Sequence, residues 1–191
     1  MRKYNIGVFG SAVDASKSVT KSAVLIGKEL ARFKCTIITG ACAGLPYVAA
    51  VAAHNAGGKI IGFSPARGFG EQAETSPRND NAMYHKLVYT PKNFPFSNNL
   101  NASRKYRNVL STATCDAGII ISGRWGTLNE FTNLYDMGKV IGVLAGSGGV
   151  ADELPKLLAK ISKQSKAKVI FNKSPKKLVS LVINELKKQR R

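Results

Sequence analysis

The sequence predicts one α/β domain in which a doubly wound sheet of mostly parallel strands is flanked by helices. Short runs of β-branched residues alternate with longer segments of helical periodicity, the pattern of parallel strands joined by crossover helices. Several of these runs are apolar throughout, as strands covered on both faces should be. A length of 191 residues suits one compact domain, residues 1–191, and leaves little room for a second.

Each expected strand is a short apolar or β-branched run, and each expected helix spaces its apolar residues so that they share one face. The expected strands are Asn5–Phe9, Cys35–Thr39, Lys59–Phe63, Lys86–Tyr89, Ala117–Ile121, Val140–Leu144 and Lys168–Phe171. The expected helices are Lys17–Arg32, Pro46–Asn55, Asn99–Thr112, Thr127–Met137, Asp152–Ser162 and Pro175–Lys188. Pro46 and Pro175 suit a first helical turn, where a missing N–H costs nothing.

Residues 64–98 are expected to form a long loop region around the short strand Lys86–Tyr89. The stretch is rich in Pro, Gly, Ser and Asn. Loops of this length in compact domains are often lids or binding loops. A solvated surface loop without a role is an equally good interpretation of the composition.

The charge balance predicts an anionic partner. The chain has 29 Lys and Arg against 11 Asp and Glu, a net charge of +18. Nucleic acid, a membrane surface and a phosphorylated metabolite all fit such a charge. Residues 151–191 hold 12 Lys and Arg against 3 Asp and Glu, so +9 belongs to this segment and its basic C-terminal helix. That half of the charge is consistent with a solvated surface, an interaction patch or a solubility device.

The sequence favours a cytoplasmic protein without a membrane segment, a metal or a cofactor. The first residues lack an apolar stretch followed by a small-residue cleavage site, and no run approaches 18 apolar residues. The cysteines, Cys35, Cys42 and Cys115, lack the C-x-x-C spacing of a zinc knuckle and are first expected to be small core residues. Cys42, which lies in a glycine-rich turn, is the one that could have another role. His54 and His85 show no metal-ligand spacing.

Three expected strands run into glycine-rich turns that precede helices. These turns are residues 9–12, 39–46 and 121–127. In a parallel sheet they lie together at the carboxyl edge, where backbone N–H groups and helix N-termini favour anions. Glycine in one such turn can be explained by the tight connection from strand to helix. Three such turns in one small domain favour a site for a phosphate-bearing ligand. The expected ligand-binding residues here are Gly10, Ser11, Gly40, Gly44, Gly123, Arg124, Gly126 and Thr127.

Two common nucleotide-binding motifs are absent. No turn matches G-x-x-x-x-G-K-[ST], which disfavours a P-loop nucleoside triphosphatase. The first turn lacks G-x-G-x-x-G and a ribose-binding acid at the expected distance, which disfavours ordinary NAD binding.

Residues 40–46, continued by Ala49-Ala50, Gly57-Gly58 and Ile60-Ile61-Gly62, resemble the G-G-G-x-x-G-L-M…A…G-G-x-V-I-G block of the LOG family, once misnamed lysine decarboxylases. Residues 122–130 resemble that family's P-G-G-x-G-T-x-x-E signature, and Arg104-Lys105 stand where the family has an Arg-Lys pair. The resemblance spans roughly residues 5–150 and implies a Rossmann-like homodimer.

Active LOG proteins are phosphoribohydrolases that release a cytokinin base from its nucleoside 5′-monophosphate. The resemblance implies that Arg104 and Glu130 are the catalytic pair and that Gly123, Gly126 and Thr127 cradle the 5′-phosphate, with Lys105 beside them. The chemistry fits these residue types, because a carboxylate can stabilise or attack an oxocarbenium-like sugar while guanidinium groups hold phosphate. Without the resemblance, Glu130 could simply complement a helix dipole and Arg104 could lie on a solvated face.

The chain departs from the family pattern at several positions. Ser122 and Arg124 replace the proline and second glycine of the signature, and Ala41 and Cys42 replace glycines of the first block. Arg124 either adds a phosphate contact or occupies space that a substrate needs. Trp125 either stacks on a base or packs beneath the lid. Nucleotide binding is still expected with these departures, but they do not indicate that the base of the nucleotide is a cytokinin.

Three functions therefore stand in order. The first is a nucleotide-binding phosphoribohydrolase that cleaves the N-glycosidic bond. The second is a carrier of a nucleotide or of molybdenum cofactor without turnover, since one relative is such a carrier. The third is nucleic-acid binding, since the superfamily includes a DNA-processing protein. It ranks last because the aromatic residues, 8% of the chain, are not interleaved with the basic clusters.

Overall fold

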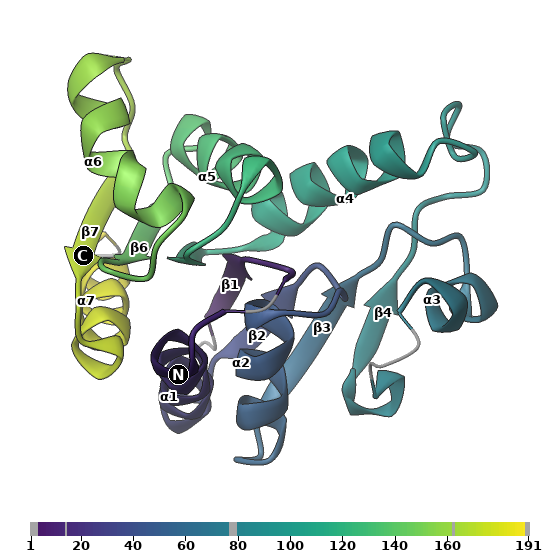
Figure 1. Cartoon of the computed structure of the whole chain (residues 1–191), viewed down its shortest axis with the longest axis horizontal. Helices are drawn as coiled ribbons and strands as arrows, with labels where there is room; N and C mark the ends of the chain where they lie inside the picture. The colour runs from purple at the N-terminus through teal and green to yellow at the C-terminus, as the bar shows by residue number, and fades with distance from the viewer. Residues whose placement is uncertain (1–3, 14, 77–79, 162, 190–191) are drawn as a thin grey trace.

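The described residues form one seven-stranded parallel sheet. Helices lie on both of its faces, as Figure 1 shows. This computed structural model describes residues 4–13, 15–76, 80–161 and 163–189. The strand order is β4-β3-β2-β1-β5-β6-β7, and every neighbouring pair is parallel. The strands are β1 (Asn5–Gly10), β2 (Thr36–Thr39), β3 (Lys59–Phe63), β4 (Lys86–Val88), β5 (Ala117–Ile121), β6 (Val140–Leu144) and β7 (Lys168–Asn172). The predicted Rossmann-like α/β class is confirmed.

Two layers of α-helices cover the sheet. The α-helices of the described residues are α1 (Lys17–Arg32), α2 (Leu45–His54), α3 (Phe69–Thr75), α4 (Leu100–Thr114), α5 (Trp125–Asp136), α6 (Val150–Lys160) and α7 (Pro175–Lys188), and there is a 3-10 helix, η1 (Asn81–Met83). Helices α1, α2 and α7 lie on one face, and α4, α5 and α6 lie on the other (Figure 1). The chain winds outward from β1 to β4, and α4 then crosses the other face to reach β5. The direction of winding therefore changes between β1 and β5, where open α/β sheets bind ligands.

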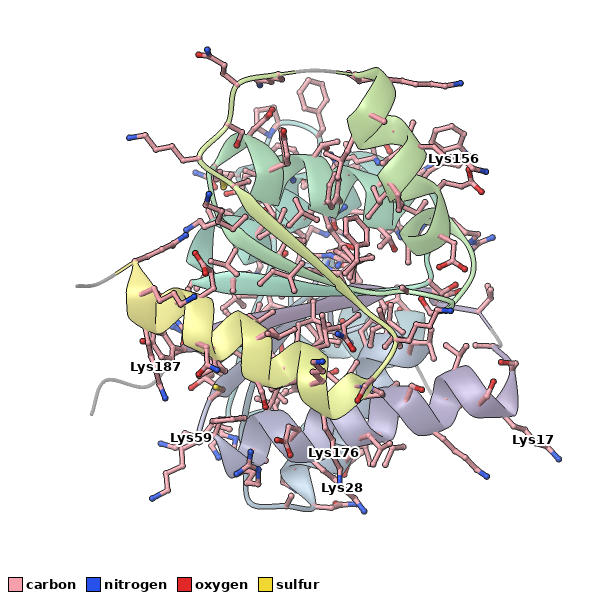
Figure 2. The ribbon with its side chains drawn as sticks, turned by 90° about the vertical axis from the view of Figure 1, so that its left-hand side faces the viewer. Lys17, Lys28, Lys59, Lys156, Lys176 and Lys187 are labelled. Carbon is pink, nitrogen blue, oxygen red and sulfur yellow. The ribbon has the colours of Figure 1, made fainter. Side chains whose placement is uncertain are left out.

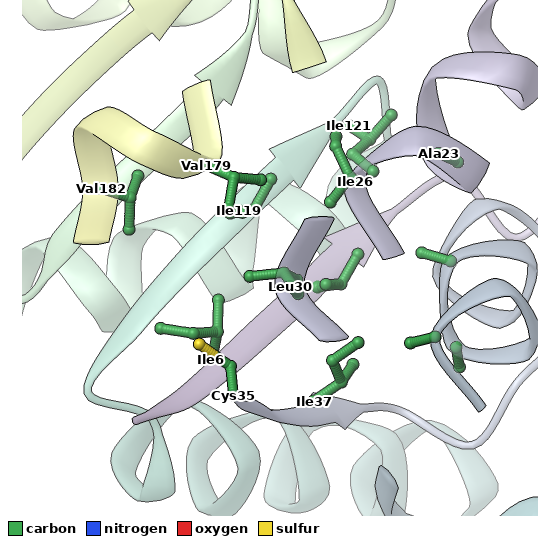
Figure 3. Packing of buried hydrophobic residues seen from close by; sticks show 14 of the residues in the cluster. Ile6, Ala23, Ile26, Leu30, Cys35, Ile37, Ile119, Ile121, Val179 and Val182 are labelled. Atoms are coloured by element: carbon green, nitrogen blue, oxygen red, sulfur yellow. The ribbon is translucent and has the colours of Figure 1, made fainter. Parts of the chain in front are cut away.

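Each face of the sheet has its own apolar core. On the first face, Ile6, Ile37 and Ile119 of the central strands pack with helix residues that include Leu30 and Val179 (Figure 3). All five are fully buried. The second core lies under α5 and α6 and includes Phe131, Leu134 and Leu154. This burial on both faces explains why the central strands read as continuous apolar runs.

Each end of the predicted strands and helices lies within two residues of the corresponding end in the structure. Asn99, predicted as the first residue of α4, is its N-cap, and its Oδ1 accepts hydrogen bonds from the N–H groups of Asn101 and Ala102 at 3.0 and 3.1 Å. Helix α6 was expected to reach Ser162, which lies outside the described residues. Among the described helices, none combines the length and the apolar character needed to cross a membrane.

Helix α3 and η1 were not predicted. Both lie inside the region 64–98, whose composition indicates loop. Helix α3 begins after Gly68 without a side-chain cap, so the usual N-terminal signal is missing. A tertiary contact stabilises the helix, because the side chain of Gln72, which belongs to α3, is fully buried.

Candidate functional site

A cleft of about 620 Å³ opens at the carboxyl edge of the sheet. The three predicted glycine turns contribute to its wall, together with α4, α5 and the end of α3. Nine of the eleven predicted site residues line it: Gly10, Ser11, Gly40, Arg104, Lys105, Arg124, Gly126, Thr127 and Glu130. The other two, Gly44 and Gly123, shape the turns behind it.

The first two glycine turns are joined directly. The N–H of Leu45 donates a hydrogen bond to the carbonyl of Ser11 at 2.8 Å. Gly44 has a φ of +96°, and a Cβ atom there would lie 2.2 Å from the Ser11 carbonyl oxygen. Glycine is therefore needed at position 44 both for its conformation and for the close approach of two backbones. Its role is to place Ser11 at the cleft.

The third turn is held by a fourth glycine turn, which was not predicted from the sequence. This turn, residues 145–149, joins β6 to α6. Ser147 accepts a hydrogen bond from the Ser122 N–H at 2.8 Å, and the Val150 N–H donates to the Gly123 carbonyl at 2.9 Å. Gly123 takes the left-handed φ of +106°, whereas Arg124 is extended at −130°. Arginine at position 124 therefore causes no backbone strain.

Helix α5 presents its N-terminus to the cleft. Its first hydrogen bond runs from Leu128 N–H to the Arg124 carbonyl at 2.9 Å, so the helix ladder leaves the N–H groups of residues 125–127 free for an anion. Gly126 and the buried Thr127 line the cleft there. Trp125 is 81% exposed, so it does not pack beneath the lid.

Glu130 and Arg107 form a buried ion pair at the cleft. Arg107 Nη1 lies 3.6 Å from Glu130 Oε1, and the two side chains are only 10% and 9% exposed. Glu130 is the sixth residue of α5, beyond the first turn in which a carboxylate would serve the helix dipole. The dipole interpretation of Glu130 is therefore wrong.

Burial changes the acidity of Glu130. It raises the pKa of the carboxyl to about 7, although the nearby positive charges of Arg107 and Lys105 act in the opposite direction. The Asn108 amide, in the orientation that gives it partners, donates to Glu130 Oε1 at 3.3 Å and to the Arg104 carbonyl at 3.0 Å. Near neutral pH, Glu130 can thus hold or release a proton, as a catalytic acid or base requires.

Arg107, and not Arg104, is the arginine that reaches Glu130. Arg104 is exposed at the cleft, and its Nη1 donates to Asn101 Oδ1 at 3.1 Å. A Cβ atom at Gly40 would lie 1.7 Å from Arg107 Nη1, so this glycine provides the space for the guanidinium. The sequence signal for Arg107 was its position one helical turn after Arg104, but the spacing alone does not say which of the two is buried.

Cys42 is the cysteine of the cleft. Its thiol donates to the Gly40 carbonyl at 3.2 Å and lies 3.5 Å from Arg107 Nη2. Cys35 and Cys115 are buried, as expected of core residues, and all three are free thiols. Within the described residues, no group of three or more His, Cys, Asp or Glu side chains is placed to hold a metal ion.

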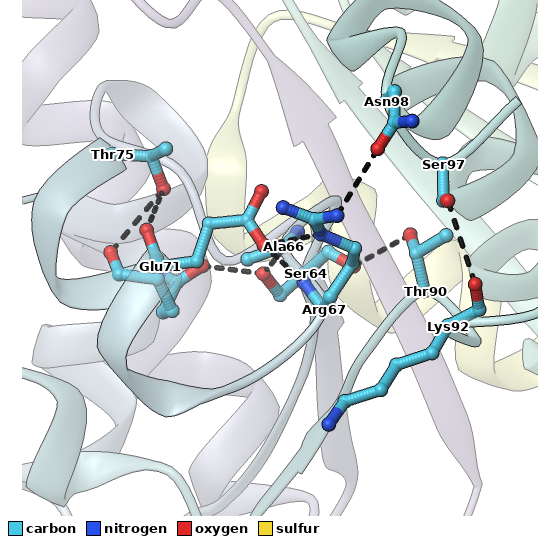
Figure 4. Close-up of polar contacts among 10 residues, drawn as sticks. Ser64, Ala66, Arg67, Glu71, Thr75, Thr90, Lys92, Ser97 and Asn98 are labelled. Atoms are coloured by element: carbon cyan, nitrogen blue, oxygen red, sulfur yellow. Dashed lines mark hydrogen bonds and ion pairs between the residues drawn. The ribbon is translucent and has the colours of Figure 1, made fainter.

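The region 64–98 contributes one wall of the cleft through Thr75 and Ser76. Gln72 anchors it: its Nε2 donates to the Ala41 carbonyl at 2.9 Å, and its Oε1 accepts from the Ser64 hydroxyl at 2.5 Å. Figure 4 shows other polar contacts of the region, among them the hydrogen bond that Arg67 Nη1 donates to Asn98 Oδ1 at 3.1 Å. The end of α3 is therefore tied to the second glycine turn.

Many solved structures have a similar fold, and three of them are described here. A structural-genomics target named TM1055 has a TM-score of 0.77 at 18% identity over 95% of this chain and 99% of its own. The molybdenum cofactor binding protein from Rippkaea orientalis has a TM-score of 0.69 at 21% identity over 97% of this chain and 99% of its own. DNA processing protein A from Streptococcus pneumoniae has a TM-score of 0.67 at 20% identity over 93% of this chain but 61% of its own. At these identities the likeness establishes the fold.

Sequence comparison places the chain more closely. No curated protein matches it. The sequence model of the SLOG cluster4 family matches residues 3–179, nearly the whole chain. The predicted LOG-like, Rossmann-like relationship is thereby confirmed, and the chain belongs to the SLOG cluster4 family.

Proposed function

We propose that the chain binds a nucleoside 5′-monophosphate in the cleft and hydrolyses its N-glycosidic bond. The observation that carries the proposal is the buried Arg107–Glu130 pair, 3.6 Å apart, beside the N-terminus of α5. The free N–H groups at the start of α5, with Arg104, Lys105 and Arg124, suit the 5′-phosphate. Glu130 then lies on the side of the ligand where the sugar carbon reacts.

In the proposed reaction, water adds to C1′ of the ribose and the C1′–N bond breaks. The electron pair of that bond goes to the base nitrogen, which takes up a proton, and the products are a free base and ribose 5-phosphate. Glu130 acts either on the water, by accepting its proton, or on C1′ directly, as a nucleophile that water later displaces. Arg107 holds the Glu130 carboxylate, and Arg104 positions the substrate.

The test is base release from a panel of purine nucleoside 5′-monophosphates that includes N6-substituted AMP, followed by chromatography. Glu130→Gln is expected to abolish release and to retain nucleotide binding in calorimetry. The matched control is Glu153→Gln, an exposed carboxylate on α6, which should leave release unchanged. If wild-type protein releases no base from any member of the panel, the hydrolase proposal fails.

A carrier without turnover is the second candidate, and the cations of the cleft favour it. Arg104, Lys105, Arg107 and Arg124 face it with Glu130 as the one acidic side chain among the lining residues. This excess suits long retention of a multiply charged ligand, such as the cofactor named for the Rippkaea protein. Native mass spectrometry of purified protein distinguishes the two: a retained ligand with no product supports the carrier.

We also propose that the protein is a homodimer that buries Trp125. Large exposed aromatic side chains are enriched in protein interfaces, and Trp125 is 81% exposed on α5. The molar mass measured by light scattering during size-exclusion chromatography should be that of a dimer for the wild type. For Trp125→Asp it should shift toward that of a monomer. Ile161→Asp, at a residue 67% exposed, is the control and should remain a dimer. A monomeric wild type would contradict this proposal.

A further inference from the structure

The two helical layers differ strongly in charge. Helices α1, α2 and α7 carry eight Lys and Arg against two acidic residues, whereas α4, α5 and α6 carry five against four. The cleft cations Arg104 and Arg107 belong to the second layer. The larger positive charge therefore lies on the opposite side of the sheet from these cleft arginines, and the proposed ligand does not account for it.

Six exposed lysines define this surface, which we call the lysine face. They are Lys17, Lys21 and Lys28 on α1 and Lys176, Lys177 and Lys187 on α7. The two helices pack against each other, and Figure 2 shows labelled lysines from both pointing outward. Within the described part of the chain, none of the six forms an ion pair.

The acidic residues of these two helices do not neutralise the lysine face. Glu29 is buried, and Arg32 Nη2 holds it at 2.6 Å. Glu185 is half-buried and forms no ion pair with a described residue. The lysine charges therefore add to one another over the surface, which costs stability unless a partner supplies negative charge.

The spread of the lysines indicates a polymer. Lys17 and Lys28 are separated by about 16 Å along α1, at a helical rise of about 1.5 Å per residue. A single phosphate cannot contact both, whereas duplex nucleic acid presents one negative charge per about 1.7 Å of its axis.

The remaining composition of α1 and α7 favours a duplex. Neither helix contains an aromatic residue, so neither offers a stacking platform for single-stranded bases. Of the described side chains of both helices, Leu25 is the one large apolar group counted as exposed, at 38%, which is little for insertion into a bilayer. We propose that the lysine face binds the phosphate backbone of double-stranded nucleic acid, independently of sequence and of the cleft.

The test measures anisotropy of a labelled random-sequence DNA duplex as a function of salt. If four or five phosphates are neutralised, the logarithm of the binding constant should fall with the logarithm of the salt concentration with a slope of about −4. Lys17→Gln/Lys28→Gln/Lys176→Gln should make the slope shallower by about 3 and weaken binding at least about tenfold at low salt. The control, Lys86→Gln/Lys156→Gln/Lys160→Gln, removes the same charge from exposed lysines outside the face and should bind like wild type.

Four results would overturn the proposal. In the first, the wild type does not bind the duplex at about 50 mM salt. In the second, both triple variants lose the same affinity, which would show that binding depends on the net charge of the protein and not on the lysine face. Millimolar AMP could displace the duplex, which would move binding to the cleft. Phosphatidylserine vesicles could bind more tightly than the duplex and lose this binding in the lysine-face variant, which would identify a membrane surface.

Discussion

Arg107 Nη1 and Glu130 Oε1 lie 3.6 Å apart, with both side chains about nine-tenths buried. The pair joins α4 to α5 beneath the cleft, and Gly40 leaves the space that the guanidinium occupies. A buried carboxylate without this cation would be neutral over a wider pH range. The proposed chemistry therefore depends on Arg107 through Glu130, while Arg104 acts at the entrance.

The two arginines should differ in the kinetic parameter that they control. Arg107→Gln removes the cation beside Glu130 and is expected to lower kcat by about 100-fold, the size of effect seen when one preorganised charge partner is lost. Arg104→Gln, at the exposed end of the cleft, should mainly raise KM, by about tenfold. Steady-state kinetics of base release separates the two. Equal effects of both variants on kcat would contradict the assignment.

The raised pKa of Glu130 should make stability depend on pH. In the folded protein the pKa of the Glu130 carboxyl is about 7, above its ordinary value of 4.5, because burial favours the neutral form. The native state therefore binds the proton more tightly, so the stabilisation is full below pH 4.5 and is lost as the pH rises through 7. Urea unfolding at several pH values should show the wild type losing stability relative to Glu130→Gln across this window. A constant difference between the two proteins would exclude the shift.

Gly40→Ala should inactivate the site without a large loss of stability. Its Cβ atom would lie 1.7 Å from Arg107 Nη1, and the flexible guanidinium must move away from Glu130. Base release should fall as it does in Arg107→Gln. The double variant Gly40→Ala/Arg107→Gln should be little worse than either single variant, because both remove the same contact. Additive losses in kcat would show that Gly40 acts in another way.

Gly44 and Gly57 allow the cost of close backbone approach to be measured. Both have positive φ, +96° and +76°, but a Cβ atom at Gly57 meets nothing within 4 Å, whereas one at Gly44 meets the Ser11 backbone at 2.2 Å. Gly57→Ala should lower the unfolding free energy by about 1 kcal/mol, the cost of the left-handed conformation. Gly44→Ala should cost at least about 2 kcal/mol more. Denaturant unfolding of both variants gives this difference directly.

The sequence predicted the sheet well because each strand and its following helix have local signals. Apolar runs such as residues 117–121 are buried on both faces, and Pro175 occupies the first position of α7 as expected. The three glycine turns were predicted for the same reason, since glycine at the end of a strand is a local feature.

What the sequence could not supply was contact between distant residues. Helix α3 is held by Gln72, which bonds to Ala41 31 positions earlier, and no pattern within residues 69–75 contains that contact. The choice of Arg107 over Arg104 likewise depends on Gly40, far away in sequence. The turn at residues 145–149 supports Ser122 and Gly123 from the neighbouring strand.

The central position of β1 has a consequence for biosynthesis. Its residues leave the ribosome well before residues 117–121, which cover one of its edges. At about 5–20 residues per second this edge waits on the order of ten seconds for its partner. During that time Ile6 and Val8, later at the centre of the protein, belong to an open apolar strand. The nascent chain should therefore be a substrate for chaperones that bind extended apolar segments until β5 emerges.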